Sequence, residues 1–391
     1  MPRRPVEIEP ELVGAIHGKS VRATVTRRTL LTLAAASAAL TGCSRTQTDQ
    51  PLPAGGYALL VQNLFPGYRD MDGSATGRVI VVNTAGEIIA QSPEFDPLQP
   101  GRFCLSQGAL WWASRRADFS WDSTGTHHWP RSKRDAHVWS TQPLPGGGAV
   151  LVLNIGSTEG GQYQSVVLTL NSSGPSPQQF RGLISGLGVC GRSILAFTRP
   201  EVDPPHVSLT HLSPGEGFGT TSGDSVPSDG LWGESLACSA DELFTLRTTW
   251  GQDSRTSETM LSRWNVLTGE RRDLPLRGNG IGSPASWRDG SFGPSRLLQN
   301  ENALLWSNQW GLMSTDLSTA ATRTVWRDDN AFVVDSLALT GHVVVRQDGR
   351  AVTIDRRRVT DGALIETVSV RTLPDPSDLM VTDVAFLGPA H

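Results

Sequence analysis

Acidic side chains between the repeated segments of this chain are the first candidates for chemistry. Ca²⁺ binds about six to eight oxygen ligands in proteins, so a cluster of carboxylates could hold one. Aspartate is also common in loops, and that alone could account for the set. The residues are Asp96, Asp135, Asp229, Asp328, Asp329 and Asp378. A separate run, Asp70-Met71-Asp72-Gly73, begins like a Ca²⁺-binding loop but lacks the acidic ligand expected downstream.

Aromatic and histidine residues form a second candidate site. On an accessible loop they could stack on sugars or anchor a partner protein. Adjacent residues of a strand point to opposite faces, which argues against one metal held by both histidines. The favoured alternative places Trp111 and Trp121 in the hydrophobic core and makes the loop a solvated hairpin. The set is Trp111, Trp112, Trp121, His127, His128, Trp129 and Trp139, with Arg131, Lys133 and Arg134 among them.

Motifs that signal catalysis are missing from the sequence. No GxSxG, HExxH, Walker loop or dinucleotide fingerprint occurs in the context that it requires. Asp241 and Glu242 are neighbouring carboxylates, but they fall in an expected turn that faces solvent. Acid–base catalysis needs convergent groups in a cavity. The sequence therefore assigns no catalytic residue and favours a binding role.

The N-terminal segment resembles a bacterial lipoprotein export signal. A basic stretch with Arg22, Arg27 and Arg28 precedes 12 uncharged residues, 29–40. This apolar run is too short to span a bilayer, which takes about 20 residues. The box Leu40-Thr41-Gly42-Cys43 follows. The resemblance implies cleavage before Cys43 and acylation of its thiol.

The route of export has two interpretations. Arg27 and Arg28 in Thr-Arg-Arg-Thr-Leu-Leu resemble the twin-arginine signal of the pathway for folded proteins, although no Phe or Lys follows. Ordinary unfolded export is the alternative route. The alternative to a signal altogether is a buried N-terminal helix that happens to end in Gly42-Cys43. We expect a cleaved signal at 1–42, a lipid-anchored tether at 43–56, and a domain at 57–391 on the outer face of the cell membrane. Two or more acyl chains, such as palmitate, give stable anchoring.

Charge and length limit the partners of the mature chain. From Cys43 onward it has 349 residues, enough for one large core. Its 28 basic and 35 acidic residues give a net charge of −7. This charge argues against nucleic acid and against binding of an anionic lipid surface through the domain itself. The expected partners are the membrane, through the anchor, and an envelope protein or an extracytoplasmic ligand.

The cysteines favour a structural role. With Cys43 acylated, Cys104, Cys190 and Cys238 remain, so at most one disulfide can form within the chain. No CxxC pair and no metal-ligand spacing occurs. Small core side chains are the simplest interpretation. A Cys190–Cys238 bridge is an open alternative that would require Cα atoms within about 7 Å.

A strand that ends in a polar turn recurs along the chain and predicts the fold. Glycine and Asn or Asp are the residues that tight turns need, because they tolerate positive φ. From Gly86 to Gly362 the mean spacing is 46 residues. The turns are Asn83–Gly86, Asp122–Gly125, Asn171–Gly174, Ser213–Gly215, Val266–Gly269, Asp316–Ala320 and Val359–Gly362.

Each turn is preceded by a strand of small residues and then a strongly apolar strand. Four antiparallel strands in a repeat of this length indicate an all-β fold, a β-propeller. Seven turns indicate seven blades, although six or eight would also fit. Residues 57–61 resemble a second strand with no first strand before them. We therefore expect the C-terminal strand, 380–387, to complete blade 1 and close the ring.

The repeats resemble the broad WD40-like and quinoprotein-like propeller groups. The turn Thr268-Gly269-Glu270 after Trp264-Asn265 comes closest to the quinoprotein pattern. The regular Trp-docking positions of quinoproteins and the Gly-His to Trp-Asp spacing of WD40 repeats are missing, so no cofactor follows from the likeness. A glycan hydrolase or lyase, a lactonase or a quinone-cofactor dehydrogenase is the catalytic alternative. Three or more convergent Asp, Glu or His residues at the channel mouth would favour it.

Overall fold

The structure is a computed structural model of the chain. It describes residues 50–63, 76–132, 134–157, 163–199, 206–213, 217–220, 226–227, 230–232, 236–239, 241–249, 258–278, 296–328, 330–374 and 379–389. Within these ranges every regular element is a β-strand. The described residues include no helix that is long and apolar enough to cross a membrane.

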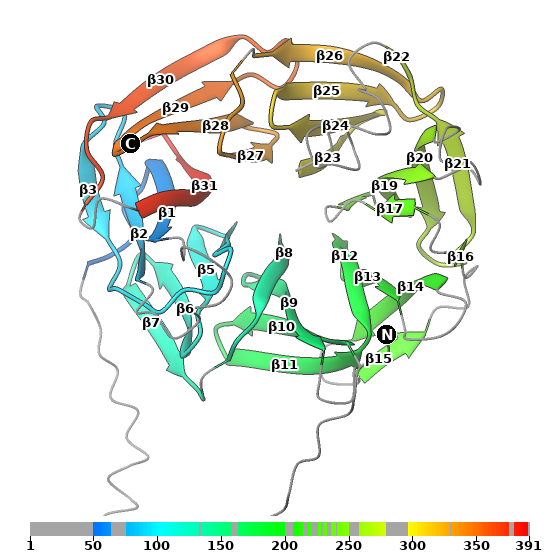
Figure 1. Ribbon diagram of the computed structural model, residues 1–391, viewed down its shortest axis with the longest axis horizontal. Helices are drawn as coiled ribbons and strands as arrows, with labels where there is room; N and C mark the ends of the chain where they lie inside the picture. The colour runs from blue at the N-terminus through cyan, green and yellow to red at the C-terminus, as the bar shows by residue number, and fades with distance from the viewer. Residues whose placement is uncertain are drawn as a thin grey trace, which may run out of the picture. The chain divides into compact units, whose positions relative to one another are not determined.

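The strands form seven sheets arranged as a ring, a seven-bladed β-propeller (Figure 1). The prediction of seven blades is confirmed. Blade 1 contains, from the channel outward, β31 (Leu379–Gly388), β1 (Gly56–Asn63), β2 (Gly77–Val82) and β3 (Ile88–Gln91). Blade 2 contains β4 (Phe103–Ser106), β5 (Ala109–Ala113), β6 (Ala117–Asp122) and β7 (Gly125–Pro130). Blade 3 contains β8 (His137–Pro143), β9 (Ala149–Ser157), β10 (Tyr163–Asn171) and β11 (Gly174–Arg181).

Blades 4 and 5 have additional short strands. Blade 4 contains β12 (Leu183–Cys190), β13 (Ser193–Arg199), β14 (His206–Ser213) and β15 (Gly217–Thr220), and β16 (Val226–Pro227) also pairs with β14. In blade 5 two inner strands, β17 (Gly230–Trp232) and β18 (Ala237–Cys238), pair with β19 (Glu242–Thr249), which is followed by β20 (Glu258–Asn265) and β21 (Arg271–Pro275).

Blade 6 contains β23 (Arg296–Asn300), β24 (Ala303–Asn308), β25 (Gly311–Asp316) and β26 (Ala321–Arg327). The segment β22 (Arg277–Gly278) leaves blade 5 and pairs in parallel with β26, so it covers that outer edge. Blade 7 contains β27 (Val334–Ala338), β28 (Gly341–Asp348), β29 (Ala351–Arg357) and β30 (Leu364–Val370).

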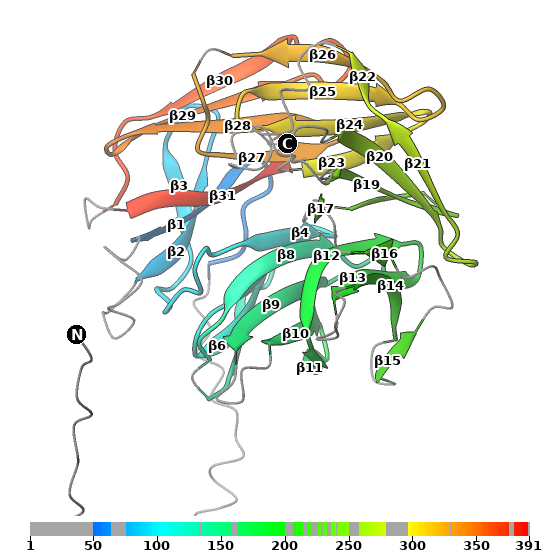
Figure 2. The same cartoon turned by 45° about the vertical axis from the view of Figure 1, so that its right-hand side comes forward.

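The innermost strands contact one another around the whole ring, from β31 through β4, β8, β12, β18, β23 and β27 back to β31 (Figure 2). As predicted, the C-terminal strand β31 pairs antiparallel with β1, from Gly56 with Gly388 to Asn63 with Leu379. This pairing removes the open sheet edge that an unclosed blade 1 would expose.

The core lies between blades. Seven buried clusters fill the seven spaces between neighbouring sheets. Trp112 and Trp121 lie between blades 1 and 2 and are completely buried. Since each blade buries both of its faces, its strands contain almost continuous apolar residues rather than alternating ones.

Two structural features explain why glycine recurs in the turns. Gly269 and Gly362 have φ of 71° and 73°, the left-handed region that favours glycine, and the copy without glycine has Ala320 at 57°. A Cβ atom at Gly362 would also lie 2.5 Å from Cβ of Trp326 in the preceding blade. The same approach occurs at Gly86, where a Cβ atom would lie 2.1 Å from the carbonyl oxygen of Ser369. The turn of each of these blades therefore packs on the outer strand of its neighbour.

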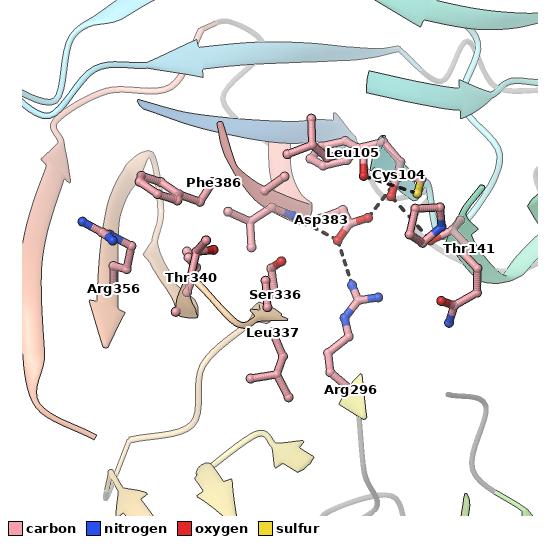
Figure 3. A pocket seen from close by; sticks show the side chains of 18 of the residues that line it. Cys104, Leu105, Thr141, Arg296, Ser336, Leu337, Thr340, Arg356, Asp383 and Phe386 are labelled. Atoms are coloured by element: carbon pink, nitrogen blue, oxygen red, sulfur yellow. Dashed lines mark hydrogen bonds and ion pairs between the residues drawn. The ribbon is translucent and has the colours of Figure 1, made fainter. Parts of the chain in front are cut away.

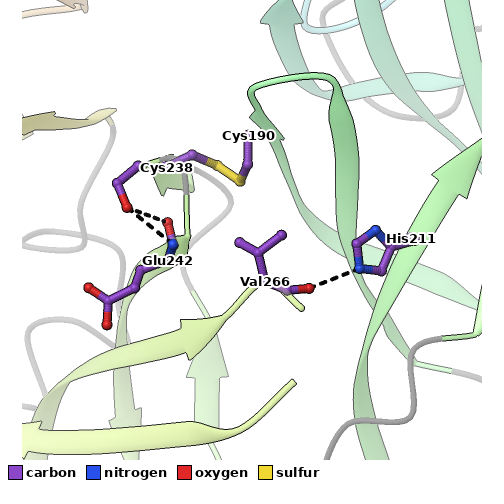
Figure 4. Close-up of a disulfide and its surroundings, with 6 residues drawn as sticks. Cys190, His211, Cys238, Glu242 and Val266 are labelled. Carbon is purple, nitrogen blue, oxygen red and sulfur yellow. Dashed lines mark hydrogen bonds between the residues drawn. A yellow bond between two sulfur atoms is a disulfide. The ribbon is translucent and has the colours of Figure 1, made fainter. Parts of the chain in front are cut away.

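A disulfide joins blades 4 and 5. Cys190 and Cys238 end the inner strands β12 and β18, and their Cα atoms are 5.1 Å apart (Figure 4). Next to the bridge, Nε2 of His211 lies 3.0 Å from the carbonyl oxygen of Val266, which links the same two blades. The structure therefore contains the Cys190–Cys238 disulfide, which the sequence left open as an alternative. Cys104 is a buried free thiol.

Candidate functional site

A pocket of about 260 Å³ lies on the inner side of the ring. Its walls come mainly from the inner strands of blades 1, 2, 3, 6 and 7, so distant parts of the sequence meet there (Figure 3). Leu105, Leu337 and Phe386 supply apolar walls, while Thr141 and Ser336 supply hydroxyl groups. Ligand pockets for small molecules are commonly about 300–1,000 Å³. This pocket therefore suits a single side chain or a small fragment.

Asp383 is the carboxylate of this pocket, and both of its oxygens accept hydrogen bonds. Oδ2 accepts one from the amide of Phe103 at 3.0 Å. Oδ1 accepts one from the amide of Val384 at 3.0 Å and one from Nη2 of Arg296 at 2.9 Å. Burial raises the pKa of Asp383, while Arg296, Arg102 and the two amides act in the opposite direction. The side chain thus lines the pocket as a hydrogen-bonded carboxylate that joins blades 1, 2 and 6.

The free thiol beside Asp383 is not prepared for nucleophilic attack. Cys104 is buried, and burial together with the charge of Asp383 raises its pKa well above the ordinary thiol range. A nucleophilic cysteine needs the opposite, a lowered pKa that favours the thiolate. Cys104 therefore acts as a core side chain, as the sequence indicated.

Arg356 forms another wall of the pocket. Its guanidinium carbon lies 4.2 Å from the ring centre of Phe386, a cation–π contact. Nε of Arg356 donates a 2.7 Å hydrogen bond to Glu366, which also accepts one from the hydroxyl of Tyr57. The guanidinium group of Arg356 is therefore fixed by Phe386 of blade 1 and Glu366 of blade 7.

A buried polar chain lies directly behind the pocket. Ser307 and His342 both bond to Oδ2 of Asp335, the latter through Nε2 at 3.0 Å. Nδ1 of His342 accepts a hydrogen bond of 3.2 Å from Nε1 of Trp326. A catalytic triad requires the serine to bond to the histidine, whereas here both bond to the carboxylate. With Ser307 and His342 fully buried, this chain fixes blade 6 to blade 7.

Burial alone would raise the pKa of Asp335, but His342, Arg296 and Ser307 together hold it below its ordinary value. The carboxylate is therefore charged, and it is stabilised by buried donors rather than by solvent. Nε of Arg296 also donates a hydrogen bond to the backbone carbonyl of Asp335 at 3.2 Å, so the same arginine touches both buried acids of the region.

The structure places three members of the acidic set. Asp96 and Asp135 both face Arg115, at 3.6 Å from Nη1 and 2.9 Å from Nε respectively. Asp328 is elsewhere, in an ion pair with Arg346. Among the described residues no group of three or more His, Cys, Asp or Glu side chains could hold a metal ion. Asp229, Asp329 and Asp378 lie outside the described residues, as do Asp70, Asp72 and Gly73.

The aromatic candidate is largely core, the alternative that the sequence favoured. Trp112 and Trp121 are fully buried, and Trp111 stacks on Trp129 with ring centres 6.3 Å apart. Nε1 of Trp139 donates a hydrogen bond of 3.1 Å to the carbonyl of Ser185, a contact between blades 3 and 4. His127 and His128 are half-buried on β7. Lys133 lies outside the described residues.

Next to this cluster lies a buried carboxylate that the sequence did not reveal. Asp118 on β6 contacts Nε of Arg131 at 3.1 Å and Nη2 of Arg134 at 2.8 Å. Burial raises the pKa of Asp118 to about 6, although Arg131 acts in the opposite direction. The two arginines that were candidate ligand contacts are therefore used within blade 2.

The residues of the export signal and the anchor lie outside the described part of the chain. These are Arg27, Arg28, Leu40, Thr41, Gly42 and Cys43. The described residues begin within the segment expected to be a tether, 43–56. Leu52 is buried there in the cluster between blades 1 and 2, and its amide donates a 2.8 Å hydrogen bond to the carbonyl of Asp122, so the chain from Gln50 onward packs on the propeller.

Asp383 and Arg296 were not predicted as site residues, although the sequence contains one signal for Asp383. Asp383 is the only charged residue in the otherwise apolar or small run Met380–Leu387. A carboxylate within an apolar strand next to the channel is expected to be buried, and a buried charge must be paired. The identity of the partner could not be obtained this way, because it depends on how three blades meet.

Comparisons with known proteins give likenesses of fold only. No family model matches the chain, and no curated protein matches it. A putative 6-phosphogluconolactonase from Bacteroides uniformis is 10% identical, with 84% of this chain and 99% of that chain covered and a TM-score of 0.45. A second one, from Bacteroides fragilis, is 11% identical over 84% and 98%, with a TM-score of 0.47. A protein from Lactobacillus plantarum is 12% identical over 85% and 100%, with a TM-score of 0.48. At these values the likeness carries no argument about activity.

Proposed function

We propose that this chain is an exported, lipid-anchored β-propeller that binds a partner at the cell envelope without catalysis. The observation that carries the proposal is the state of Asp383. Its oxygens accept three hydrogen bonds from Phe103, Val384 and Arg296, so the pocket has a fixed polar floor rather than a free acid or base. Catalytic acid–base groups need to exchange a proton with the substrate.

The size and walls of the pocket support a protein side chain or a small extracytoplasmic ligand as its occupant. Apolar walls and a polar floor in a volume of about 260 Å³ suit an anchor residue of the kind that dominates many protein interfaces. The walls are mixed in character, with Arg356 and Thr141 beside Leu337 and Phe386. In the described part of the pocket Asp383 is the one acidic residue, and the three convergent groups expected of an enzyme are not assembled there.

The disulfide supports export. Disulfides form and persist mainly in oxidising compartments outside the cytosol. Cys190 and Cys238 are joined in the folded protein, whereas the free Cys104 is buried away from thiol exchange. This agrees with the export signal and the lipid-bearing Cys43 that the sequence indicates.

The anchor is tested by intact mass and membrane fractionation of the natively expressed protein beside a Cys43→Ala variant. We expect acylation at Cys43 and release of the variant into the soluble fraction. An unmodified full-length protein in the cytosol would overturn the localisation.

The binding role is tested by placing a photo-crosslinking residue at Leu337, a wall of the pocket. We expect a crosslinked envelope protein or small ligand that disappears when Ser336→Trp fills the pocket. The same crosslinker at Leu267, which is 81% exposed on blade 5, is the matched control. Equal capture at both positions would contradict the role of the pocket. Turnover of a lactone or glycan that Ser336→Trp abolishes would replace binding with catalysis.

A further inference from the structure

We infer that the rim of the propeller at strand β3 contacts the lipid bilayer in the anchored protein. This inference rests on the proposed acylation of Cys43. The chain enters the domain at residues 50–52, between the outer parts of blades 1 and 2. The carbonyl of Gln50 accepts a 2.9 Å hydrogen bond from Nε1 of Trp121 on β6. Nε2 of Gln50 donates a 3.1 Å bond to the carbonyl of Ile89 on β3.

The chain between the anchor and this entry point is short. Six residues lie between Cys43 and Gln50, so the two are seven Cα-to-Cα steps apart. An extended chain advances at most ~3.5 Å per residue, so Gln50 lies no more than about 25 Å from the acylated residue. A compact domain of about 340 residues has a radius of gyration of about 20 Å and is about 50 Å across. The side opposite the entry point therefore cannot rest on the bilayer.

The entry point has exposed apolar side chains beside it. Ile88 and Ile89 are 37% and 40% exposed on β3, the outermost strand of blade 1. A β-bulge places Ile89 between the paired positions Ile88 and Ala90, so that two consecutive isoleucines face outward. The neighbouring carboxylate, Glu87, accepts a 2.9 Å hydrogen bond from Asn83. The apolar pair is thus held on the strand to which Gln50 is bonded.

The contact that we infer is apolar and not electrostatic. The mature chain has a net charge of −7, which opposes attraction to an anionic surface. Two isoleucines alone would bind a bilayer weakly, but the anchor raises their effective concentration at the surface. The contact should therefore be insensitive to salt and should form on neutral lipids.

The far side of the ring provides a matched control. Leu267 in the β20–β21 turn is an aliphatic residue that is 81% exposed. In a ring of seven blades, blade 5 lies opposite the junction of blades 1 and 2, and Figure 1 shows β3 and β21 on opposite sides. Any general affinity of exposed aliphatic residues for lipid would affect both positions equally.

The test uses the acylated protein in neutral phosphatidylcholine vesicles. Ile89→Cys and Leu267→Cys are each labelled with a fluorophore, because Cys104 is buried and Cys190 is bonded to Cys238. A nitroxide on the lipid headgroup or acyl chain quenches nearby probes. We expect at least threefold stronger quenching at position 89 than at 267, unchanged between 50 mM and 500 mM salt. Gln91→Cys, on the same strand, serves as a second probe if Ile89→Cys does not fold.

The outcomes separate this inference from the proposed function. Equal quenching at both positions, or stronger quenching at 267, in protein shown by mass to be acylated would overturn the inference and leave the anchor intact. Failure of the native protein to acquire lipid and to enter the vesicles would overturn both. Quenching at 89 that salt abolishes would contradict the apolar contact.

Discussion

Arg296 and Asp383 form an ion pair between two blades that are not neighbours in the ring. Nη2 of Arg296, on the inner strand of blade 6, lies 2.9 Å from Oδ1 of Asp383, on the strand that closes blade 1. Blade 7 lies between them, and Nε of the same arginine bonds to its residue Asp335. One guanidinium group therefore connects three consecutive blades at the channel.

Arg296→Gln should lower the free energy of unfolding by about 2–4 kcal/mol at pH 7, because it leaves the buried Asp383 without its cationic partner. Asp383→Asn should cost less, since Arg296 is 24% exposed and can be hydrated. Urea unfolding measures both. The control is Arg116→Gln, which removes an exposed ion pair of 3.6 Å with Asp96 and should change stability by less than about 0.5 kcal/mol. Equal losses for Arg116→Gln and Arg296→Gln would contradict the role of the pair.

Gly269→Val should destabilise the protein by about 2–3 kcal/mol, because φ at this position is +71° and a β-branched residue is strained there. Thermal unfolding measures the loss. Gly146→Val is the matched control, since a Cβ atom there meets nothing within 4 Å. Ala320→Gly should change stability little, because relief of strain at φ +57° offsets the loss of a fully buried methyl group. An unchanged melting temperature for Gly269→Val would contradict this account of the turn.

Reduction of the Cys190–Cys238 bridge should lower stability by about 2–4 kcal/mol. The bridge closes a loop of 48 residues, for which the chain-entropy model gives about 4 kcal/mol. We expect dithiothreitol to lower the melting temperature of the wild type and to leave the Cys190→Ala/Cys238→Ala variant unaffected. Sensitivity of that variant to the reductant would mean that the effect arises elsewhere.

Asp118 should make the protein less stable as the pH rises from about 4 to about 7. Burial raises its pKa from 3.8 to about 6 in the folded protein, so the folded state binds the proton more tightly than the unfolded state. The favourable contribution is complete below pH 3.8 and is lost through pH 6, a change of about 3 kcal/mol. Asp118→Asn should remove this dependence, which the difference between the two unfolding curves isolates.

Asp316→Asn provides a control of opposite sign. Hydrogen bonds from Ser318 and Thr319 lower the pKa of Asp316 to about 2. The stability that this carboxylate contributes is present above pH 4 and is lost as the pH falls toward 2. A parallel pH dependence for both aspartates would show that the assignment of Asp118 is wrong.

The fold could be predicted because its signals are local. Most of the turns have Asn or Asp followed by Gly within a few residues, with Ser213-Pro214-Gly215 and Asp316–Ala320 as the exceptions, and the spacing of the turns indicates the number of blades. The closing role of residues 380–387 followed from counting strands, since residues 57–61 lacked a first strand. The bulge at Ile89 and the parallel segment β22 could not be predicted, because both depend on contacts at the outer edges of the sheets.

The candidate site was harder to predict, because its pairs connect residues far apart in the sequence. Asp383 and Arg296 are 87 residues apart, and Asp383 and Phe103 are 280 apart. The acidic residues were selected for their place in connections, but sequence spacing does not reveal that Arg115 lies between Asp96 and Asp135. To predict which arginine pairs with each of these aspartates, one must know how the strands and blades pack in the folded ring.

The pairing of β31 with β1 also determines when the ring can exist during synthesis. A ribosome makes residues 56–91 early, but these supply only three strands of blade 1, and the fourth arrives with residues 379–388. Until then β1 has a free edge, of the kind that pairs with other chains and promotes aggregation. Removal of residues 379–388 would therefore take away the inner contacts of β31 with β27, β28 and β4 and weaken the closure of the ring, instead of merely fraying one end.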